Sequence, residues 1–242
     1  MTQNAKHANR RLFLGGSAAL LLGACGGDSG NPVDDATGSG GADPGAGGGV
    51  GGAGGIGGLG GGTGGDDLPP IPRECTATAD NLLGPYYRPG APFRDDLTEL
   101  GMAGTRITIR GRVLGPDCEL LEGAVLDFWQ ADDDGGYDND GVADPPPDVY
   151  VLRGKVAADG DGIYAIRSIV PGHYLNGAQY RPAHVHVTVS AEGYAPLTTQ
   201  LYFDGDPYNE IDPFIIESLI MTPNTNASGE LEAWFDFVLE PL

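Results

Sequence analysis

A glycine-rich segment near the N-terminus limits what this chain of 242 residues can fold into. Residues 26–67 hold half of the chain's 42 glycines and almost no large apolar side chain. Such a segment cannot bury enough apolar surface to offset the entropy lost on ordering. We therefore expect a flexible tether over residues 26–68 and one folded domain over residues 69–242.

The first residues have the pattern of an export signal. Arg10 and Arg11 precede an apolar stretch over residues 12–24, which is shorter than the roughly 20 apolar residues that span a bilayer. Small residues then lead into Cys25, as at a cleavage site before a lipidated cysteine. We expect residues 1–25 to be the signal, with Cys25 as a lipid anchor on the periplasmic or extracellular side. The arginine pair also resembles a twin-arginine signal, and a general secretory signal is the alternative.

The charge of the folded segment excludes one class of partner. Residues 75–242 contain 27 acidic and 9 basic side chains, a formal charge of −18 with histidine neutral. Nothing in this balance would neutralise phosphates, so we expect no nucleic-acid partner. An anionic membrane face would repel the domain, which leaves the lipid anchor as the only expected membrane attachment.

Two cysteines remain once Cys25 is assigned to lipid. Cys75 and Cys118 could form a disulfide in an oxidising compartment outside the cytoplasm. Two unrelated free thiols are the alternative, because the sequence does not show whether the backbones come within bridging distance.

The folded segment reads as a series of short strands. Apolar and polar residues alternate, with Gly, Pro or Asp at the borders, over residues 105–113, 124–130, 149–157, 162–169, 183–190, 197–203 and 230–239. Only residues 212–221 have a helical spacing. This pattern predicts an all-β fold, an antiparallel β-sandwich with long loops and little helix, because a parallel α/β layout needs a helix after most strands.

The most informative pair of residues is His184 and His186. Residues two apart on a strand point to the same face and lie about 6.6 Å apart along the chain, so both rings can converge on one ion. A water-exposed polar face or a hydrogen-bonded pair of histidines would give the same spacing. A ferrous site with two histidines and one carboxylate, or a zinc or copper site, also stays open at this point.

Several short blocks, in order along the chain, are shared with a known family. They are LGPYYRPGAPFR at 83–94, WQA at 129–131 with Tyr137 after it, PGHY at 171–174, RPAHVH at 181–186 and TQLYF at 199–203. Together they resemble the intradiol ring-cleavage dioxygenases, with a finer likeness to the protocatechuate 3,4-dioxygenase type. The resemblance extends over most of the folded segment.

The resemblance implies a set of ligands for ferric iron. These are two tyrosinates, Tyr137 and Tyr174, and two histidines, His184 and His186. Without the family, each tyrosine would be read as a core aromatic residue with a bonded hydroxyl. A phenol has a pKa of about 10, so keeping it ionised at pH 7 requires about 4 kcal/mol, which a hard, highly charged cation can supply.

The resemblance also implies the reaction and the residues that perform it. The enzyme would cleave a catechol-type ring between its hydroxyl-bearing carbons with both atoms of O2, to a muconate-type product. Arg181 and Gln200 would be catalytic, with Tyr174 as the ligand that leaves and takes a substrate proton. The substrate would contact Trp129, Leu175 and Arg181.

Two departures from the family pattern bear on this expectation. The link over residues 175–180 is shorter than in the protocatechuate enzymes, so protocatechuate is not assumed as the substrate. A long helical N-terminal segment like that of the catechol 1,2-dioxygenases is not recognised either, so no oligomer is expected in particular. A non-catalytic cell-surface β-sandwich module that binds a metal or ligand is the alternative function.

An acidic loop over residues 132–144 is spaced by glycines like a calcium-binding loop. Read from Asp132, it places Gly136 where an EF-hand has its third oxygen ligand. We expect a solvated acidic loop here, with calcium as the alternative.

Overall fold

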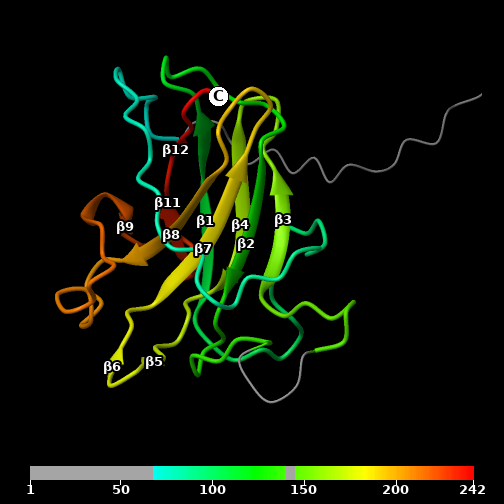
Figure 1. Ribbon diagram of the computed structural model, residues 1–242, viewed down its shortest axis with the longest axis vertical. Coiled ribbons are helices and arrows are strands. Elements are labelled where there is room, and N and C mark those ends of the chain that lie inside the picture. Colours follow the sequence, from blue (N-terminus) through cyan, green and yellow to red (C-terminus); the bar gives the residue numbers. More distant parts are fainter. Residues whose placement is uncertain (1–67, 140–144) are drawn as a thin grey trace, which may run out of the picture. The chain divides into compact units, whose positions relative to one another are not determined.

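The computed structural model describes residues 68–139 and 145–242 (Figure 1). The predicted signal over 1–25 with Cys25, all but the last residue of the predicted tether, and residues 140–144 of the acidic loop lie outside the described residues. Within the described ranges, no helix is long and apolar enough to cross a membrane.

Two five-stranded sheets make up most of the described part of the domain. The first contains β1 (Arg106–Leu114), β4 (Ile163–Ile169), β10 (Asn224–Thr225), β11 (Leu231–Trp234) and β12 (Phe237–Val238). The second has the order β3 (Arg153–Ala157), β2 (Val125–Gln130), β7 (His184–Ser190), β8 (Leu197–Phe203) and β9 (Ile220–Met221). A separate hairpin pairs β5 (Leu175–Asn176) with β6 (Gln179–Tyr180).

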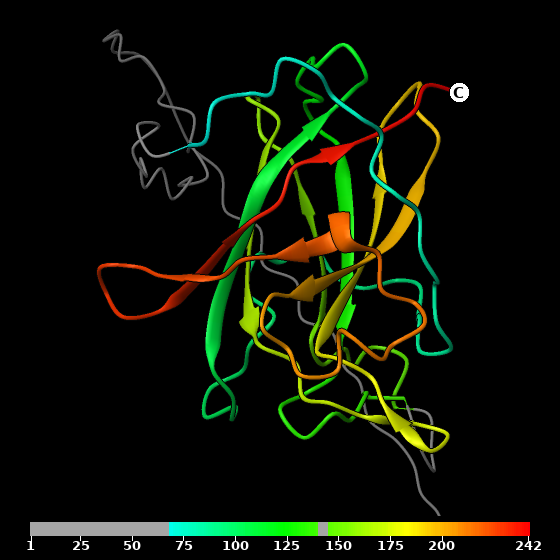
Figure 2. The same ribbon diagram turned by 90° about the vertical axis from the view of Figure 1, so that its left-hand side faces the viewer.

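One hydrophobic core joins the two sheets. Ile107 and Ile109 from β1 lie in the same buried cluster as Val187 from β7 and Leu201 from β8. Figures 1 and 2 show the two sheets facing each other, so the core lies between them. The prediction of an all-β sandwich is confirmed, and the alternation of apolar residues in β1 identifies its core-facing side.

Most neighbouring strands are antiparallel, but three pairs are parallel: β1 with β11, β1 with β12, and β8 with β9. The predicted continuous strand over 230–239 is divided between β11 and β12. Phe235 lies at the division, where its backbone N–H donates to the carbonyl of Arg110. Gly111 is required beside it, because an added Cβ would lie 1.7 Å from the carbonyl oxygen of Phe235.

The predicted helix over 212–221 is wrong. Only a 3-10 turn, η1 (Glu217–Leu219), forms there. Ile220 and Met221 instead pair with Tyr202 and Phe203 of β8. Pairing with a strand distant in sequence therefore overrides the local helical spacing.

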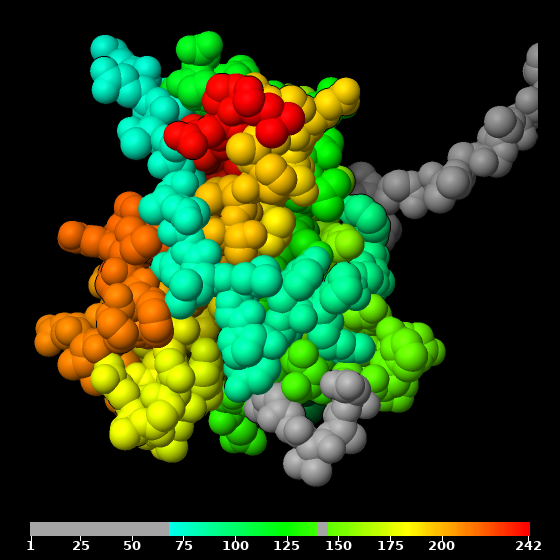
Figure 3. Space-filling view, in the orientation of Figure 1, coloured from blue at the N-terminus to red at the C-terminus, as the bar shows by residue number. Residues whose placement is uncertain are grey.

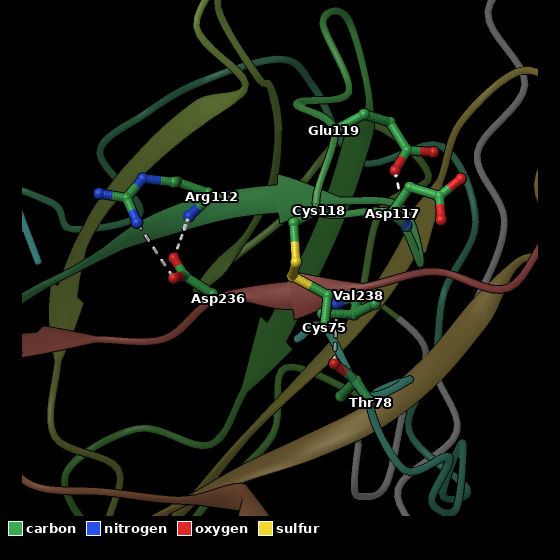
Figure 4. Close-up of a disulfide and its surroundings, with 8 residues drawn as sticks. All are labelled: Cys75, Thr78, Arg112, Asp117, Cys118, Glu119, Asp236 and Val238. Atoms are coloured by element: carbon green, nitrogen blue, oxygen red, sulfur yellow. Dashed lines mark hydrogen bonds and ion pairs between the residues drawn. A yellow bond between two sulfur atoms is a disulfide. The ribbon is translucent and has the colours of Figure 1, made fainter. Parts of the chain in front are cut away.

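A disulfide joins Cys75 to Cys118 with their Cα atoms 5.3 Å apart, which is the pairing that the sequence raised (Figure 4). It anchors residues 75–87, which we call the strap. Thr78 exchanges two hydrogen bonds of 3.0 and 2.9 Å with the backbone of Val238, and the N–H of Asn81 donates to the carbonyl of Thr198. In Figure 3 the cyan strap runs down one face of the domain beside the gold atoms of β7 and β8. The strap thus covers the second sheet on the side away from the core.

Candidate active site

Strand β7 has two buried faces with different side chains. Val185, Val187 and Val189 point into the hydrophobic core, whereas His184 and His186 lie on the opposite face. The two rings are 4.9 Å apart between centroids and only 2 % and 1 % exposed. A water-exposed polar face is therefore not what the spacing reflects.

The strap closes over the histidine face. Gly84 has φ +72°, and an added Cβ there would lie 3.0 Å from Cε1 of His186. The left-handed backbone and the close approach both favour glycine at this position. Residues of the strap thus shield His186 from solvent.

Each histidine has a ring nitrogen with no hydrogen-bond partner. Nδ1 of His184 donates to the carbonyl of Pro182 at 2.7 Å, which leaves Nε2 as a buried, unprotonated nitrogen. Nδ1 of His186 is likewise buried without a partner. Burial lowers the pKa of His184 to about 4 and holds the pKa of His186 well below its usual value. Both rings are therefore neutral, which is the form that binds metals.

Two tyrosines complete the cluster. The ring of Tyr137 lies 5.8 Å from that of Tyr174 and 6.3 Å from that of His186, and the ring of Tyr174 lies 5.6 Å from that of His184. Burial is the main reason that the pKa of both phenols is raised. The phenols stay neutral in this pocket unless a cation stabilises the phenolates. The structure brings together all four residues predicted as ligands.

Close backbone contacts hold the two tyrosine loops against each other. The N–H of Gly172 donates to the carbonyl of Asp132 at 2.7 Å. An added Cβ at Gly172 would lie 2.3 Å from the carbonyl oxygen of Asp133, and one at Gly135 would lie 2.2 Å from that of His173. Glycine at these two positions lets the loops approach closely enough for the tyrosines to meet.

Aromatic side chains line the rest of the cluster. Register places Trp129 of β2 opposite His186, and the two rings stack at 5.0 Å. Trp129 is 1 % exposed, and its ring also lies 4.8 Å from that of Tyr87. Tyr86 of the strap stacks on Tyr137 at 4.3 Å. Tyr86 lies in the first of the blocks shared with the family, but the resemblance assigned it no role.

Arg181 lies beside Tyr174 in a dense set of hydrogen bonds. Its Nη1 is 3.4 Å from the Tyr174 hydroxyl, its Nη2 donates to Oε1 of Gln200 at 2.9 Å, and its Nε donates to Asp212 at 2.5 Å. Burial alone would lower the pKa of Arg181, but the Asp212 hydrogen bond and the nearby acidic groups raise it. Asp212 was not predicted, because it opened the segment expected to be a helix.

Gln200 of β8 lies next to Arg181 in this set of hydrogen bonds. It pairs with His186 across β7 and β8 and is fully buried. Its amide donates to the carbonyl of Leu82 at 2.9 Å, while its oxygen accepts from Arg181 and, at 3.1 Å, from the hydroxyl of Tyr202. The Gln200 side chain is therefore bonded within the protein and connects Arg181 to the strap.

Leu175 is the predicted site residue that lies outside this buried cluster. It begins the β5–β6 hairpin directly after Tyr174 and is 56 % exposed. The hairpin is tied back by a hydrogen bond from the N–H of Arg181 to the carbonyl of Tyr174. Leu175 thus borders the site from the surface.

Two described carboxylates of the acidic loop are bonded within the protein, whereas Asp133 and Asp134 are exposed. Asp132 accepts from the backbone N–H groups of Asp134 and Gly136, and buried Asp138 pairs with Arg88 and Arg153. No group of three or more His, Cys, Asp or Glu side chains in residues 68–139 and 145–242 is arranged to hold a metal. Over these ranges, the two-histidine, one-carboxylate alternative therefore lacks its carboxylate.

Comparison with known proteins gives a consistent set of relatives. Residues 82–241 match a family described as Dioxygenase. A chlorocatechol 1,2-dioxygenase of Rhodococcus opacus is 33 % identical over 188 residues, which is 67 % of this chain and 72 % of that protein. The finer likeness to the protocatechuate type stays a prediction.

Solved structures agree with this assignment. The dioxygenase domain of a dioxygenase carbohydrate-binding protein fusion from Streptomyces sp. SirexAA-E is 38 % identical with a TM-score of 0.60, covering 69 % of this chain and all of that one. The 3-chlorocatechol 1,2-dioxygenase of Rhodococcus opacus 1CP is 29 % identical with a TM-score of 0.62, covering 68 % and 73 %. Shared sequence over most of the domain and a shared fold show that this chain belongs to the intradiol ring-cleavage dioxygenase family.

Proposed function

We propose that the domain cleaves catechol-type rings between the two hydroxyl-bearing carbons, adding both atoms of O2 to give a muconate-type dicarboxylic acid. The observation that carries this proposal is the buried cluster of two neutral histidines, each with an unpartnered ring nitrogen, and two tyrosines. Family membership supplies the class of reaction.

Tyr137, Tyr174, His184 and His186 would hold ferric iron. The donor set fits, because the imidazoles are neutral and the buried phenols ionise only beside a strong positive charge. Two phenolates would offset two of the three charges of the ion, so the buried site would carry little net charge. When bound, ferric iron draws electron density from the catecholate and makes its ring reactive toward O2.

The two tyrosines differ in ways that assign them different roles. Tyr137 is 6 % exposed and packed under Tyr86, whereas Tyr174 is only partly buried at the start of the hairpin. We assign Tyr174 as the ligand that substrate would displace, and its phenolate oxygen would take a proton from a catechol hydroxyl. Tyr137 would stay in place throughout.

Arg181 would stabilise negative charge, and Gln200 would hold Arg181 in its orientation. Nη1 of Arg181 already faces the Tyr174 hydroxyl, so it can donate to that oxygen or to negative charge on the bound substrate. Gln200 holds the other arm of the guanidinium, so we assign it an orienting role. Trp129 would keep the ring of His186 in one orientation by stacking.

Export and anchoring are proposed separately. We infer that the chain is exported, by the twin-arginine route, and attached to the membrane through lipid on Cys25. The disulfide between Cys75 and Cys118 supports this, because such bonds persist mainly in oxidising compartments. Mass spectrometry of the mature N-terminus tests it. A diacylated cysteine at position 25 is the expected result, and an unmodified Cys25 within an intact N-terminus would contradict it.

The visible spectrum of the purified protein tests the proposed site. A charge-transfer band from tyrosinate to ferric iron should be present, and it should shift when a catechol is added without oxygen. Admitting O2 should then consume one O2 per catechol and give a product heavier than the substrate by both oxygen atoms. A sample stripped of metal serves as the control.

Two results would argue against the proposal in different ways. A protein that stays colourless after ferric loading would reject the tyrosinate ligands. A coloured protein that consumes no oxygen with any catechol in a panel would instead support the alternative, a metal-binding module without catalytic activity.

A further inference from the structure

The guanidinium of Arg181 is held on three sides. Nε donates to Oδ2 of Asp212 at 2.5 Å, and Nη2 donates to Gln200 and, at 3.3 Å, to the hydroxyl of Tyr202. The face of the group lies over the ring of Phe214, with Cζ 4.9 Å from the ring centroid. Of its three nitrogens, Nη1 is the one that faces Tyr174.

Asp212 is itself fixed in place. Its side chain is 1 % exposed, and its Oδ1 accepts from the backbone N–H of Phe214 at 2.8 Å. The carboxylate therefore bonds the arginine with one oxygen and the loop after β8 with the other. This loop also supplies Phe214, so one short segment holds both an edge and a face of the guanidinium.

These contacts determine which edge of Arg181 reaches the site. A guanidinium is planar and can turn about its Cδ–Nε bond, and each orientation presents different N–H groups. Bonding of Nε to Asp212 and of Nη2 to Gln200 fixes the plane, which leaves Nη1 toward Tyr174. Loss of the carboxylate would leave a buried cation unpaired and remove the contact that selects this orientation.

We propose that Asp212 is a positioning residue for ring cleavage, which acts by holding Arg181 so that Nη1 faces Tyr174 and the bound catecholate. This inference rests on the proposed function. Over the described residues, the Asp212 side chain makes no hydrogen bond to Tyr174, His184 or His186, so its hydrogen bonds reach the site through Arg181.

The test substitutes Asp212→Asn in the iron-loaded protein. The amide keeps the shape of the side chain but removes its charge and one acceptor. We expect kcat to fall about 10- to 100-fold, because a misdirected donor stabilises the transition state less. The affinity for catechol, measured without oxygen from the shift of the visible band, should change less than about threefold, since the ligands of the ion are untouched.

A matched control is Asp236→Asn. Asp236 also pairs with a buried arginine, Arg112, at 3.4 Å, but in the other sheet. This variant should lower the melting temperature and leave kcat unchanged. A fall of kcat in Asp212→Asn alone would therefore reflect the site and not the loss of a buried ion pair in general.

Asp212→Glu covers the case in which the asparagine variant does not fold. It keeps the charge but moves the carboxylate by one methylene, so we expect a folded, iron-loaded protein with kcat lowered about 3- to 10-fold. Normal turnover in the folded asparagine variant, or in the glutamate variant if the other fails, would overturn the inference. Loss of iron from a folded variant would also overturn it, because Asp212 would then support the metal ligands.

The same experiment separates this inference from the proposed function. An unsubstituted protein without the iron band or without oxygen uptake would refute the proposed function. Normal activity in both the unsubstituted protein and Asp212→Asn would refute only the role of Asp212.

Discussion

The two halves of the candidate site are built differently. His184 and His186 lie on β7, which is hydrogen-bonded to β2 on one side and β8 on the other. Tyr137 and Tyr174 lie on loops, held by backbone contacts at glycines and by ring stacking. The sheet fixes the nitrogen donors through many cooperative hydrogen bonds, whereas a few local contacts hold the oxygen donors. We call the two histidines the strand half and the two tyrosines the loop half. Substitutions in the two halves should therefore have different effects on iron binding and activity.

Removing a histidine from the strand half should have the largest effect. In His186→Ala we expect iron content to fall to background and activity to be lost, because a neutral nitrogen donor disappears while the strand remains paired. Metal analysis of protein purified without chelator measures this. His173→Asn is the control, since His173 faces Asp206 and lies outside the cluster. An alanine variant that keeps its iron would remove His186 from the ligand set.

Arg181→Lys should have the next largest effect. Arg181 contacts Tyr174 of the loop half and Gln200 of the sheet. The ammonium cannot bond Asp212, Gln200 and Tyr174 in one plane, so we expect kcat to fall roughly 100- to 1000-fold. Steady-state kinetics and iron content are measured together. Unchanged turnover would exclude Arg181 from the mechanism.

Tyr174→Phe tests the loop half directly. We expect iron to be retained through the other three residues and kcat to fall roughly 100-fold, because the proton acceptor for the catechol is lost. The visible band should weaken but persist through Tyr137. If iron is lost as fully as in His186→Ala, the loop half is needed for iron binding as much as the strand half.

The strap offers the mildest test. In Cys118→Ser the free energy of unfolding should fall by about 4 kcal/mol, because the disulfide closes a sequence separation of 43 residues. Turnover at 25 °C should change little, since the hydrogen bonds of Thr78 with Val238 and of Leu82 with Gln200 still hold the strap. Denaturant unfolding followed by fluorescence measures the first effect, and kinetics the second. A large fall in kcat would show that the disulfide itself keeps the site assembled.

The strand half could be predicted from local sequence, and the loop half could not. Spacing alone placed His184 and His186 on one face, because period two is a property of a strand. Tyr137 and Tyr174 came only from family resemblance, since nothing local distinguishes them from the other tyrosines. Their meeting depends on backbone contacts between loops distant in sequence.

Other features escaped prediction for the same physical reason. Asp212 and Tyr86 act through contacts with residues far away in the chain. The direction of the strands next to β1 likewise depends on how long connections cross the domain, which alternation does not record. Local pattern therefore predicted the strands and the sandwich, but not the parallel pairs.

The parallel pairing of β1 has a consequence for how the chain reaches its native state. Val113 pairs with Phe237, and Thr78 bonds to Val238, so the earliest and latest segments of the domain are neighbours. Contacts this distant in sequence close large loops and make folding slow. The first sheet cannot be completed until Val238 has left the ribosome. A nascent chain stopped short of β12 would therefore expose an unpaired edge of β1.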